Sequence, residues 1–178
     1  MNLIVGSPVW LIALVTVAVL AAAIEDVVRL RISNITCAIV LATALVAMSL
    51  HHFPIALWQN AVIFLLLLAL GTFAFGRGWM GGGDVKFLSS IGLWFGFHDA
   101  LWFLASVFIV GGFVTIIYVC ARYILRREGL GRGEGKATRI PYGVAIAIGS
   151  IIVFGTQLQE ASRPYLPPGI AQYAQARS

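Results

Sequence analysis

Long apolar runs separated by short polar segments constrain this sequence more than any other feature. Hydrophobic residues make up 60% of its 178 positions and charged residues only 11%, whereas about a quarter of the residues in soluble globular domains are charged. Runs of about 17 to 25 apolar residues have the length needed to cross the hydrocarbon core of a bilayer as helices. The sequence therefore predicts an all-α, polytopic integral membrane protein.

Six apolar runs predict about six transmembrane helices. Two of them, Ile35–Leu50 and Val85–Phe97, are short, and the second would rise only about 20 Å against a hydrocarbon core of about 30 Å. We therefore expect Val85–Phe97 to begin below the interface, with the preceding glycines lining a protein or water cavity. The other four runs are Leu3–Ile24, Ile55–Phe75, Ala100–Ala121 and Ile140–Thr156.

The positions of the basic residues predict the topology. Ten of the twelve Lys and Arg residues fall in three segments between apolar runs. By the positive-inside rule, residues 25–34, 76–86 and 122–139 are cytoplasmic loops, which places both termini on the outer side. Topology then accounts for the net charge of +5 without a nucleic-acid partner. We expect one transmembrane domain over residues 1–157 and a loosely ordered outer tail over residues 158–178.

The cysteines and histidines give no sign of a metal or cofactor site. Cys37 and Cys120 lie far apart inside apolar runs, where we interpret them as small packing residues. His51, His52 and His98 fall where the outer loops are expected, which suits side chains at the membrane interface. We therefore predict that the protein binds no metal and no cofactor.

Three of the seven acidic residues lie at predicted helix ends on the cytoplasmic side: Glu25, Asp26 and Asp84. The others fall on the outer side, in the long loop or in the tail, and Asp99 is predicted to cap the run Ala100–Ala121. Two carboxylates held close together cannot both ionise cheaply, so one keeps a proton and the pair supplies an acid and a base. Acidic groups on the ends of two rigid helices at one membrane face suit an aspartic protease.

Simpler explanations of these acidic residues stay open on the residues alone. Asp84 is also explained as a helix N-cap that follows a glycine loop, and Asp26 as a charged flank of the first helix beside Arg29 and Arg31. Neighbouring residues in a helix point about 100° apart, so at most one of Glu25 and Asp26 faces Asp84. Spacing alone does not choose between them.

Three glycines precede Asp84 in the stretch "GGGDVKF", and they permit positive φ values and a close approach of another chain. This stretch, with "EDVVRLRISN" before it and "IPYGVAIAIG" after it, resembles the type IV prepilin peptidases, intramembrane aspartic proteases with a Gly-x-Gly-Asp motif. The three pieces occur in the family's order and at the expected helix ends. The resemblance covers most of residues 21–149.

Catalytic roles for Asp26 and Asp84 are implied by this resemblance. In the family the first catalytic aspartate precedes an Ile-Pro-Asn sequence, and here five residues separate Asp26 from Ile32-Ser33-Asn34, which favours Asp26 over Glu25. The second catalytic aspartate ends the Gly-x-Gly-Asp motif. The motif residues expected to support the pair or to line the substrate cleft are Gly81, Gly82, Gly83, Lys86, Asn34, Pro141, Tyr142 and Gly143.

Two departures from the family pattern refine the expectation. Ser33 stands where the family usually has proline, which removes a fixed φ and is expected to loosen the loop after the first helix. Larger members carry an amino-terminal extension with a cysteine tetrad and an N-methyltransferase activity, and such cysteines are missing here. The resemblance thus implies a short-form peptidase without the methylation step, most similar to those of tight-adherence, Flp-type pilus systems.

The resemblance implies that the protein removes the short basic leader of a prepilin or pseudopilin, cutting after a glycine at the cytoplasmic face of the bacterial inner membrane. Expected partners are the substrate's hydrophobic helix, the lipid bilayer and the pilus assembly machinery. Two other functions remain open. A non-catalytic assembly factor would bind pilins without cutting them. A small proton or cation transporter component would bind ions at Asp26 and Asp84, but the mid-helix positions are almost wholly apolar.

Overall fold

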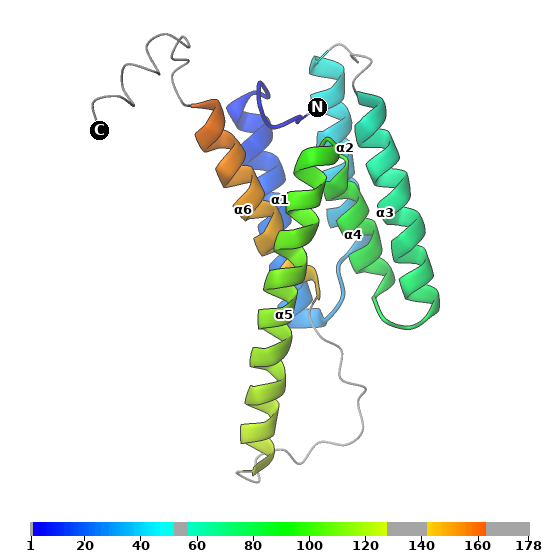
Figure 1. Cartoon of the computed structure of the whole chain (residues 1–178), viewed down its shortest axis with the longest axis vertical. Coiled ribbons are helices and arrows are strands. Elements are labelled where there is room, and N and C mark those ends of the chain that lie inside the picture. Colours follow the sequence, from blue (N-terminus) through cyan, green and yellow to red (C-terminus); the bar gives the residue numbers. More distant parts are fainter. Residues whose placement is uncertain (1, 52–56, 128–141, 163–178) are drawn as a thin grey trace, which may run out of the picture.

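The computed structural model describes residues 2–51, 57–127 and 142–162, and these residues form a bundle of six α-helices (Figure 1). The predicted helical class is therefore confirmed. α1 begins and α6 ends at the same end of the bundle, while α1 ends, α2 begins and α4 begins at the other (Figure 1). The helices are α1 Val9–Arg29, α2 Asn34–Leu50, α3 Trp58–Gly76, α4 Gly82–Gly92, α5 Phe97–Arg127 and α6 Tyr142–Ala161.

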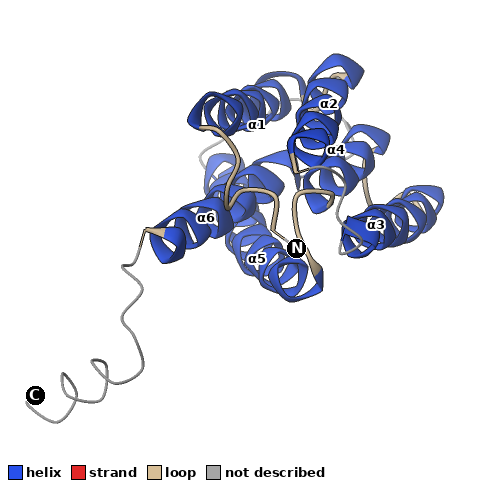
Figure 2. Ribbon diagram, turned by 90° about the horizontal axis from the view of Figure 1, so that it is seen from above, coloured by secondary structure: helices blue, strands red, loops and turns tan. Residues whose placement is uncertain are grey.

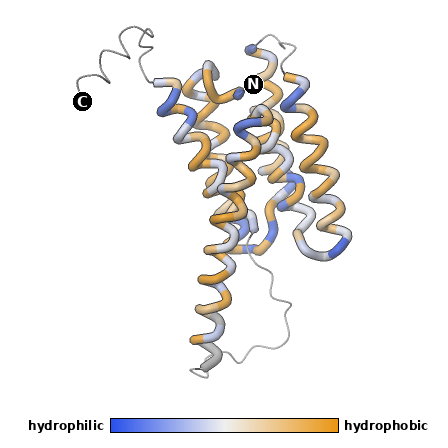
Figure 3. The backbone as a smooth tube through the Cα atoms, viewed as in Figure 1, coloured by the Kyte–Doolittle hydropathy of each residue, from blue (hydrophilic) through white to orange (hydrophobic). Residues whose placement is uncertain are grey.

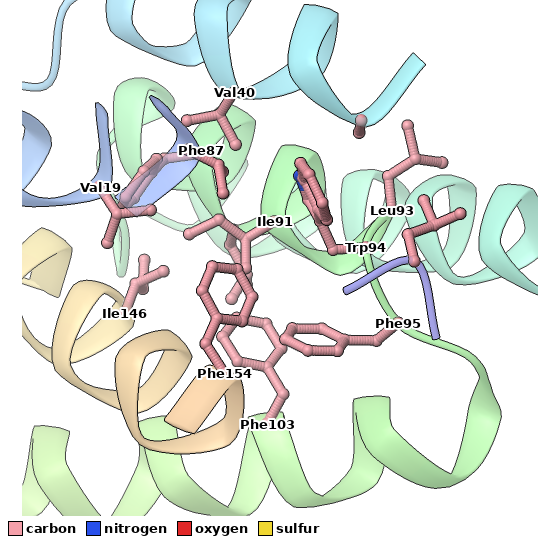
Figure 4. Packing of buried hydrophobic residues seen from close by; sticks show 14 of the residues in the cluster. Val19, Val40, Phe87, Ile91, Leu93, Trp94, Phe95, Phe103, Ile146 and Phe154 are labelled. Atoms are coloured by element: carbon pink, nitrogen blue, oxygen red, sulfur yellow. The ribbon is translucent and has the colours of Figure 1, made fainter. Parts of the chain in front are cut away.

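α4 lies in the centre of the bundle, with α2 and α3 packed on it (Figure 2). Its apolar side chains Phe87 and Ile91 are fully buried. Around them gather residues from the other helices, including Val19 of α1, Val40 of α2 and Ile146 of α6 (Figure 4). Burying large apolar side chains from every direction fixes the position of α4. The acidic start of this helix is thus held by a packed core.

Residues 2–8 form a turn segment at the N-terminal side of α1, so the predicted start of the first helix at Leu3 is wrong. Leu3 and Ile4 are almost fully buried, and the Leu3 N–H donates to the carbonyl oxygen of Trp94 at 3.1 Å. This contact lies just beyond the C-terminal end of α4. Because α4 rises only about 16 Å, the segment fills part of the bundle height that the helix does not span.

Four helices, α1, α3, α5 and α6, are long and apolar enough to cross a membrane, and α2 is a shorter apolar helix. Hydrophobic residues run along the helices, with hydrophilic positions concentrated near the helix ends (Figure 3). Many large apolar side chains, such as Phe108, Phe113 and Ile117 of α5, lie on the outside of the bundle. In water these exposed apolar side chains would favour aggregation, whereas in a bilayer they would contact lipid chains.

Several predicted boundaries are corrected by the structure. α4 begins at Gly82 and ends at Gly92, three residues before the predicted start and five before the predicted end. α5 begins at Phe97, so Asp99 lies within its first turn and is not the N-cap. Instead, its Oδ1 atom accepts a hydrogen bond from Gln157 of α6 at 2.8 Å.

The predicted long loop and tail are shorter than expected. α5 continues to Arg127, into the segment predicted as a loop, and extends past the ends of its neighbours (Figure 1). α6 continues to Ala161, into the segment predicted as a tail. Residues 128–141 and 163–178 lie outside the described part of the chain. The rest of the predicted loop and tail falls on these residues, so those predictions stay predictions.

Candidate active site

Asp26 lies buried in the last turns of α1, where it meets the beginning of α6. Its Oδ2 atom accepts a hydrogen bond from the N–H of Val144 at 3.3 Å. The first N–H groups of a helix have no partner within the helix and attract negative charge. A Cβ atom on Gly143 would lie only 2.8 Å from the same oxygen, so glycine is what allows α6 to approach the carboxyl group.

Asp84 is buried in the first turn of α4. Its Oδ2 atom accepts a hydrogen bond from the N–H of Gly81 at 3.2 Å, the residue that precedes the helix. Asp84 thus stabilises the helix start from inside the first turn, and the interpretation of it as an N-cap is corrected. The same hydrogen bond holds the carboxyl group at the N-terminal end of α4.

The glycines before Asp84 differ in the space around them. A Cβ atom on Gly83 would lie 2.8 Å from the carbonyl oxygen of Ile32, and one on Gly81 would lie 2.8 Å from a carboxyl oxygen of Asp84. Gly82 faces the ring of Phe75 at 3.4 Å, an ordinary contact. These glycines serve close approach, as expected, but none of them has a positive φ.

Ile32 connects the surroundings of the two aspartates. Its backbone lies against Gly83, next to Asp84, while its side-chain Cδ1 atom would be 2.7 Å from a Cβ atom on Gly143, next to Asp26. The three segments that carried the resemblance therefore converge on one residue at one end of the bundle. Both buried carboxyl groups belong to this neighbourhood.

Glu25 has a different environment from Asp26, although the two are adjacent in sequence. The Oε2 atom of Glu25 accepts hydrogen bonds from the N–H of Ser33 at 2.9 Å and from the hydroxyl of Thr36 at 3.0 Å. The Ser33 hydroxyl accepts a bond from the N–H of Thr36 at 3.2 Å, which caps α2. Glu25 thus anchors the start of α2, and Ser33 orders a loop that it was expected to loosen.

The other supporting residues are only partly brought together. Lys86 donates a hydrogen bond to the side-chain oxygen of Asn34 at 2.9 Å, which joins α4 to the start of α2. Tyr142, the first residue of α6, is half-buried. Pro141 lies outside the described residues. Cys37 is buried as expected, with its Sγ atom 3.7 Å from the carbonyl oxygen of Gly83, whereas Cys120 is exposed.

Comparison with protein-family models gives one match, to the type IV leader peptidase family, over residues 13–116. This match covers more than half of the 178 residues and includes both aspartates. The chain belongs to the type IV leader peptidase family. Comparisons with curated proteins and with solved structures found no match.

Membership of the type IV leader peptidase family and four apolar helices of spanning length together make this chain a membrane protein of a peptidase family. Two contributors to the candidate site of this family member were not predicted from the sequence. Ile32 is part of the Ile-Ser-Asn sequence, but only its neighbour Ser33 was assigned an effect. Val144 donates a backbone N–H to Asp26. The second contribution was open to prediction, because an acidic group expected near a helix start finds unpaired N–H groups there.

We expect Ser33→Pro to destabilise this protein, although proline is the usual residue at this position in the family that its sequence resembles. The φ of Ser33, −73°, suits a proline ring, but the change removes the N–H bonded to Glu25 and the capping hydroxyl. The expected loss is about 1–3 kcal/mol in the free energy of unfolding, against about 0.4–1 kcal/mol regained from a stiffer unfolded chain. The midpoint of thermal unfolding in detergent measures this difference.

Ser33→Ala is the matched control, because it removes the hydroxyl and keeps the N–H. It should cost about 1 kcal/mol and thus lie between the wild type and Ser33→Pro. A Ser33→Pro protein that unfolds at the wild-type temperature would show that the lost hydrogen bonds are worth no more than the stiffening of the unfolded chain.

Proposed function

We propose that this protein is a membrane-embedded aspartic endopeptidase that removes the short basic leader of prepilins or pseudopilins. The observation that carries the proposal is the pair of buried carboxyl groups, Asp26 and Asp84, on the ends of two helices whose surroundings are connected by Ile32 and Gly143. The family to which the chain belongs supports a leader peptidase. The aspartic mechanism is our inference from these residues, and the substrate is what the resemblance to the prepilin peptidases implies.

In the proposed reaction one carboxyl group is ionised and the other keeps its proton. The ionised group takes a proton from a water molecule as the water oxygen bonds to the peptide carbonyl carbon, and the protonated group donates to the carbonyl oxygen. When this tetrahedral intermediate breaks down, the C–N bond cleaves and the departing nitrogen receives the proton that the first carboxyl group took from water. A hydroxyl of the intermediate returns its proton to the second carboxyl group, which restores the pair. General acid and base catalysis of this kind contributes about 10²–10⁴-fold each.

The proposed location follows from charge. Arg29, Arg31 and Arg77 are exposed near the end of the bundle that carries the aspartates. By the positive-inside rule this end faces the cytoplasm of the bacterial inner membrane, with both termini outside. A leader that carries Lys or Arg stays on the same side for the same reason. The peptide bond after its final glycine and the two carboxyl groups then lie at one depth. Leader removal there would serve type IV or Flp-type pilus assembly or related secretion.

The test is cleavage of a reporter with a short Lys-containing leader that ends in glycine and precedes an apolar helix of about 20 residues. Co-expression with the wild type should shorten the reporter, and mass spectrometry should place the new N-terminus directly after the glycine. Asp84→Asn, which keeps an oxygen to accept the Gly81 N–H, should leave the reporter uncut while the protein still enters the membrane. A reporter that co-purifies with the wild type but is never shortened would support the non-catalytic assembly factor instead.

A further inference from the structure

A groove on the bundle is lined by residues of α2, α3 and α4. Seen from above, α4 lies between α2 and α3 (Figure 2). The groove has a volume of about 350 Å³. Apolar side chains form its walls: Ala38 and Leu41 of α2, and Phe64 and Leu68 of α3. Since these helices carry apolar residues toward the membrane, the groove is open to lipid.

One end of the groove is polar. Lys86 and Asn34 both line it, and the Lys86 ammonium group donates to the Asn34 side-chain oxygen at 2.9 Å. Asn34 is the first residue of α2 and Lys86 lies near the start of α4. The polar part of the groove therefore lies at the same end of the bundle as the aspartates, at the depth where lipid headgroups are expected. The groove therefore combines a cation at headgroup depth with an apolar channel that leads into the bundle.

The groove lies on the opposite side of α4 from Asp84. Successive residues in a helix are about 100° apart, which places Lys86 about 200° and Ser90 about 240° around the helix from Asp84. Lys86 and Ser90 line the groove, whereas Asp84 is buried. A substrate helix with its scissile bond at the aspartates would therefore approach α4 from another side, which favours a different occupant here.

We propose that this groove binds an anionic phospholipid, with one acyl chain between α2 and α3 and the phosphate group on Lys86. The apolar walls match an acyl chain, and the exposed ammonium group matches a phosphate. The site touches the candidate active site through Cys37, which lines the groove and contacts the carbonyl oxygen of Gly83. The proposal does not depend on the proposed peptidase activity.

The experiment measures lipid binding to the purified full chain in detergent by native mass spectrometry. Phosphatidylglycerol and phosphatidylcholine with identical acyl chains are titrated separately. One basic residue near the membrane surface favours an anionic lipid by about fivefold, so phosphatidylglycerol should bind about fivefold more tightly. Lys86→Gln should remove this preference, and Arg29→Gln, which removes an exposed cation outside the groove, should retain it.

A second pair of variants tests the acyl channel. Ala38→Trp places a bulky ring in the groove and should weaken the binding of both lipids severalfold. Ala21→Trp places the same ring on an exposed position of α1 and should not weaken it. This pair keeps the proposal testable even where the loss of the Lys86 bond to Asn34 disturbs the fold.

Four results would overturn the proposal. Equal binding of the two lipids would show that no cation selects the headgroup. Equal effects of Lys86→Gln and Arg29→Gln would point to diffuse surface charge. Unchanged binding to Ala38→Trp would place the lipid elsewhere. Displacement of phosphatidylglycerol by a membrane-spanning peptide with a basic leader would identify the groove as a substrate site.

Discussion

Asp26→Asn is expected to reduce cleavage of the leader reporter by at least about 1,000-fold, whereas Glu25→Gln leaves cleavage within about threefold of the wild type. The two residues are neighbours in α1, and both changes replace a carboxylate by an amide of the same shape. Their effects should differ because the two side chains face different partners. Asp26 binds the start of α6, while Glu25 binds the start of α2.

Both substitutions preserve the side-chain hydrogen bonds that the two carboxylates accept. In Asp26→Asn the amide oxygen still accepts the N–H of Val144, and in Glu25→Gln the amide oxygen still accepts from Ser33 and Thr36. Hydrogen bonds to neutral acceptors are weaker than those to charged ones, so each variant should lose only about 1 kcal/mol of stability. What Asn cannot do is take a proton from water or hold one for the substrate.

Cleavage rates with the purified variants and the reporter separate these outcomes, and unfolding temperatures within about 2–4 °C of the wild type establish that the fold is intact. Residual activity of Asp26→Asn near the wild-type level would remove Asp26 from the reaction and leave it as a cap of α6. Loss of activity in Glu25→Gln alone would move the acidic role to Glu25, against the assignment made from the resemblance.

The helical class and the helices of the membrane core follow from the sequence because apolar runs have one stable solution in lipid. The boundaries of α4 did not follow, because they depend on tertiary contacts. Helix propensity alone disfavours glycine, yet Gly82 and Gly83 are helical since α4 must begin close to Ile32 and Phe75. At the other end, the fold-back of Leu3 onto Trp94 replaces a regular start of α1, and an apolar pattern cannot distinguish a helix from a buried turn.

The candidate site was predictable to the level of residue types and helix ends. Charge and spacing located Asp26, Glu25 and Asp84 on one end of the bundle, and the resemblance favoured Asp26 over Glu25. The hydrogen-bond partners of Glu25 could be seen only in the fold, because the loop before α2 returns past α1 and presents the N–H of Ser33 to Glu25. That geometry depends on the path of the four residues between α1 and α2, which has no periodic signal in the sequence.

Gly83→Ala is expected to reduce cleavage about 10–100-fold and to destabilise the protein by about 1–3 kcal/mol. The new Cβ atom would lie 2.8 Å from the carbonyl oxygen and 3.3 Å from the nitrogen of Ile32. Backbone atoms cannot rotate away as a side chain can, so either α4 or the loop before α2 must move. Asp84 follows Gly83 directly, and a shift of about 1 Å at a reacting group costs up to about 100-fold in rate.

Gly82→Ala is the matched control, one residue earlier in the same helical turn. Its Cβ atom would meet only the ring of Phe75 at 3.4 Å, and alanine favours a helix over glycine by up to about 1 kcal/mol. This variant should therefore be at least as stable as the wild type and cut the reporter at a similar rate. The contrast gives a physical reason for the variable position in Gly-x-Gly-Asp, since Gly82 occupies it. Equal losses in the two variants would mean that the motif serves chain flexibility and not the contact with Ile32.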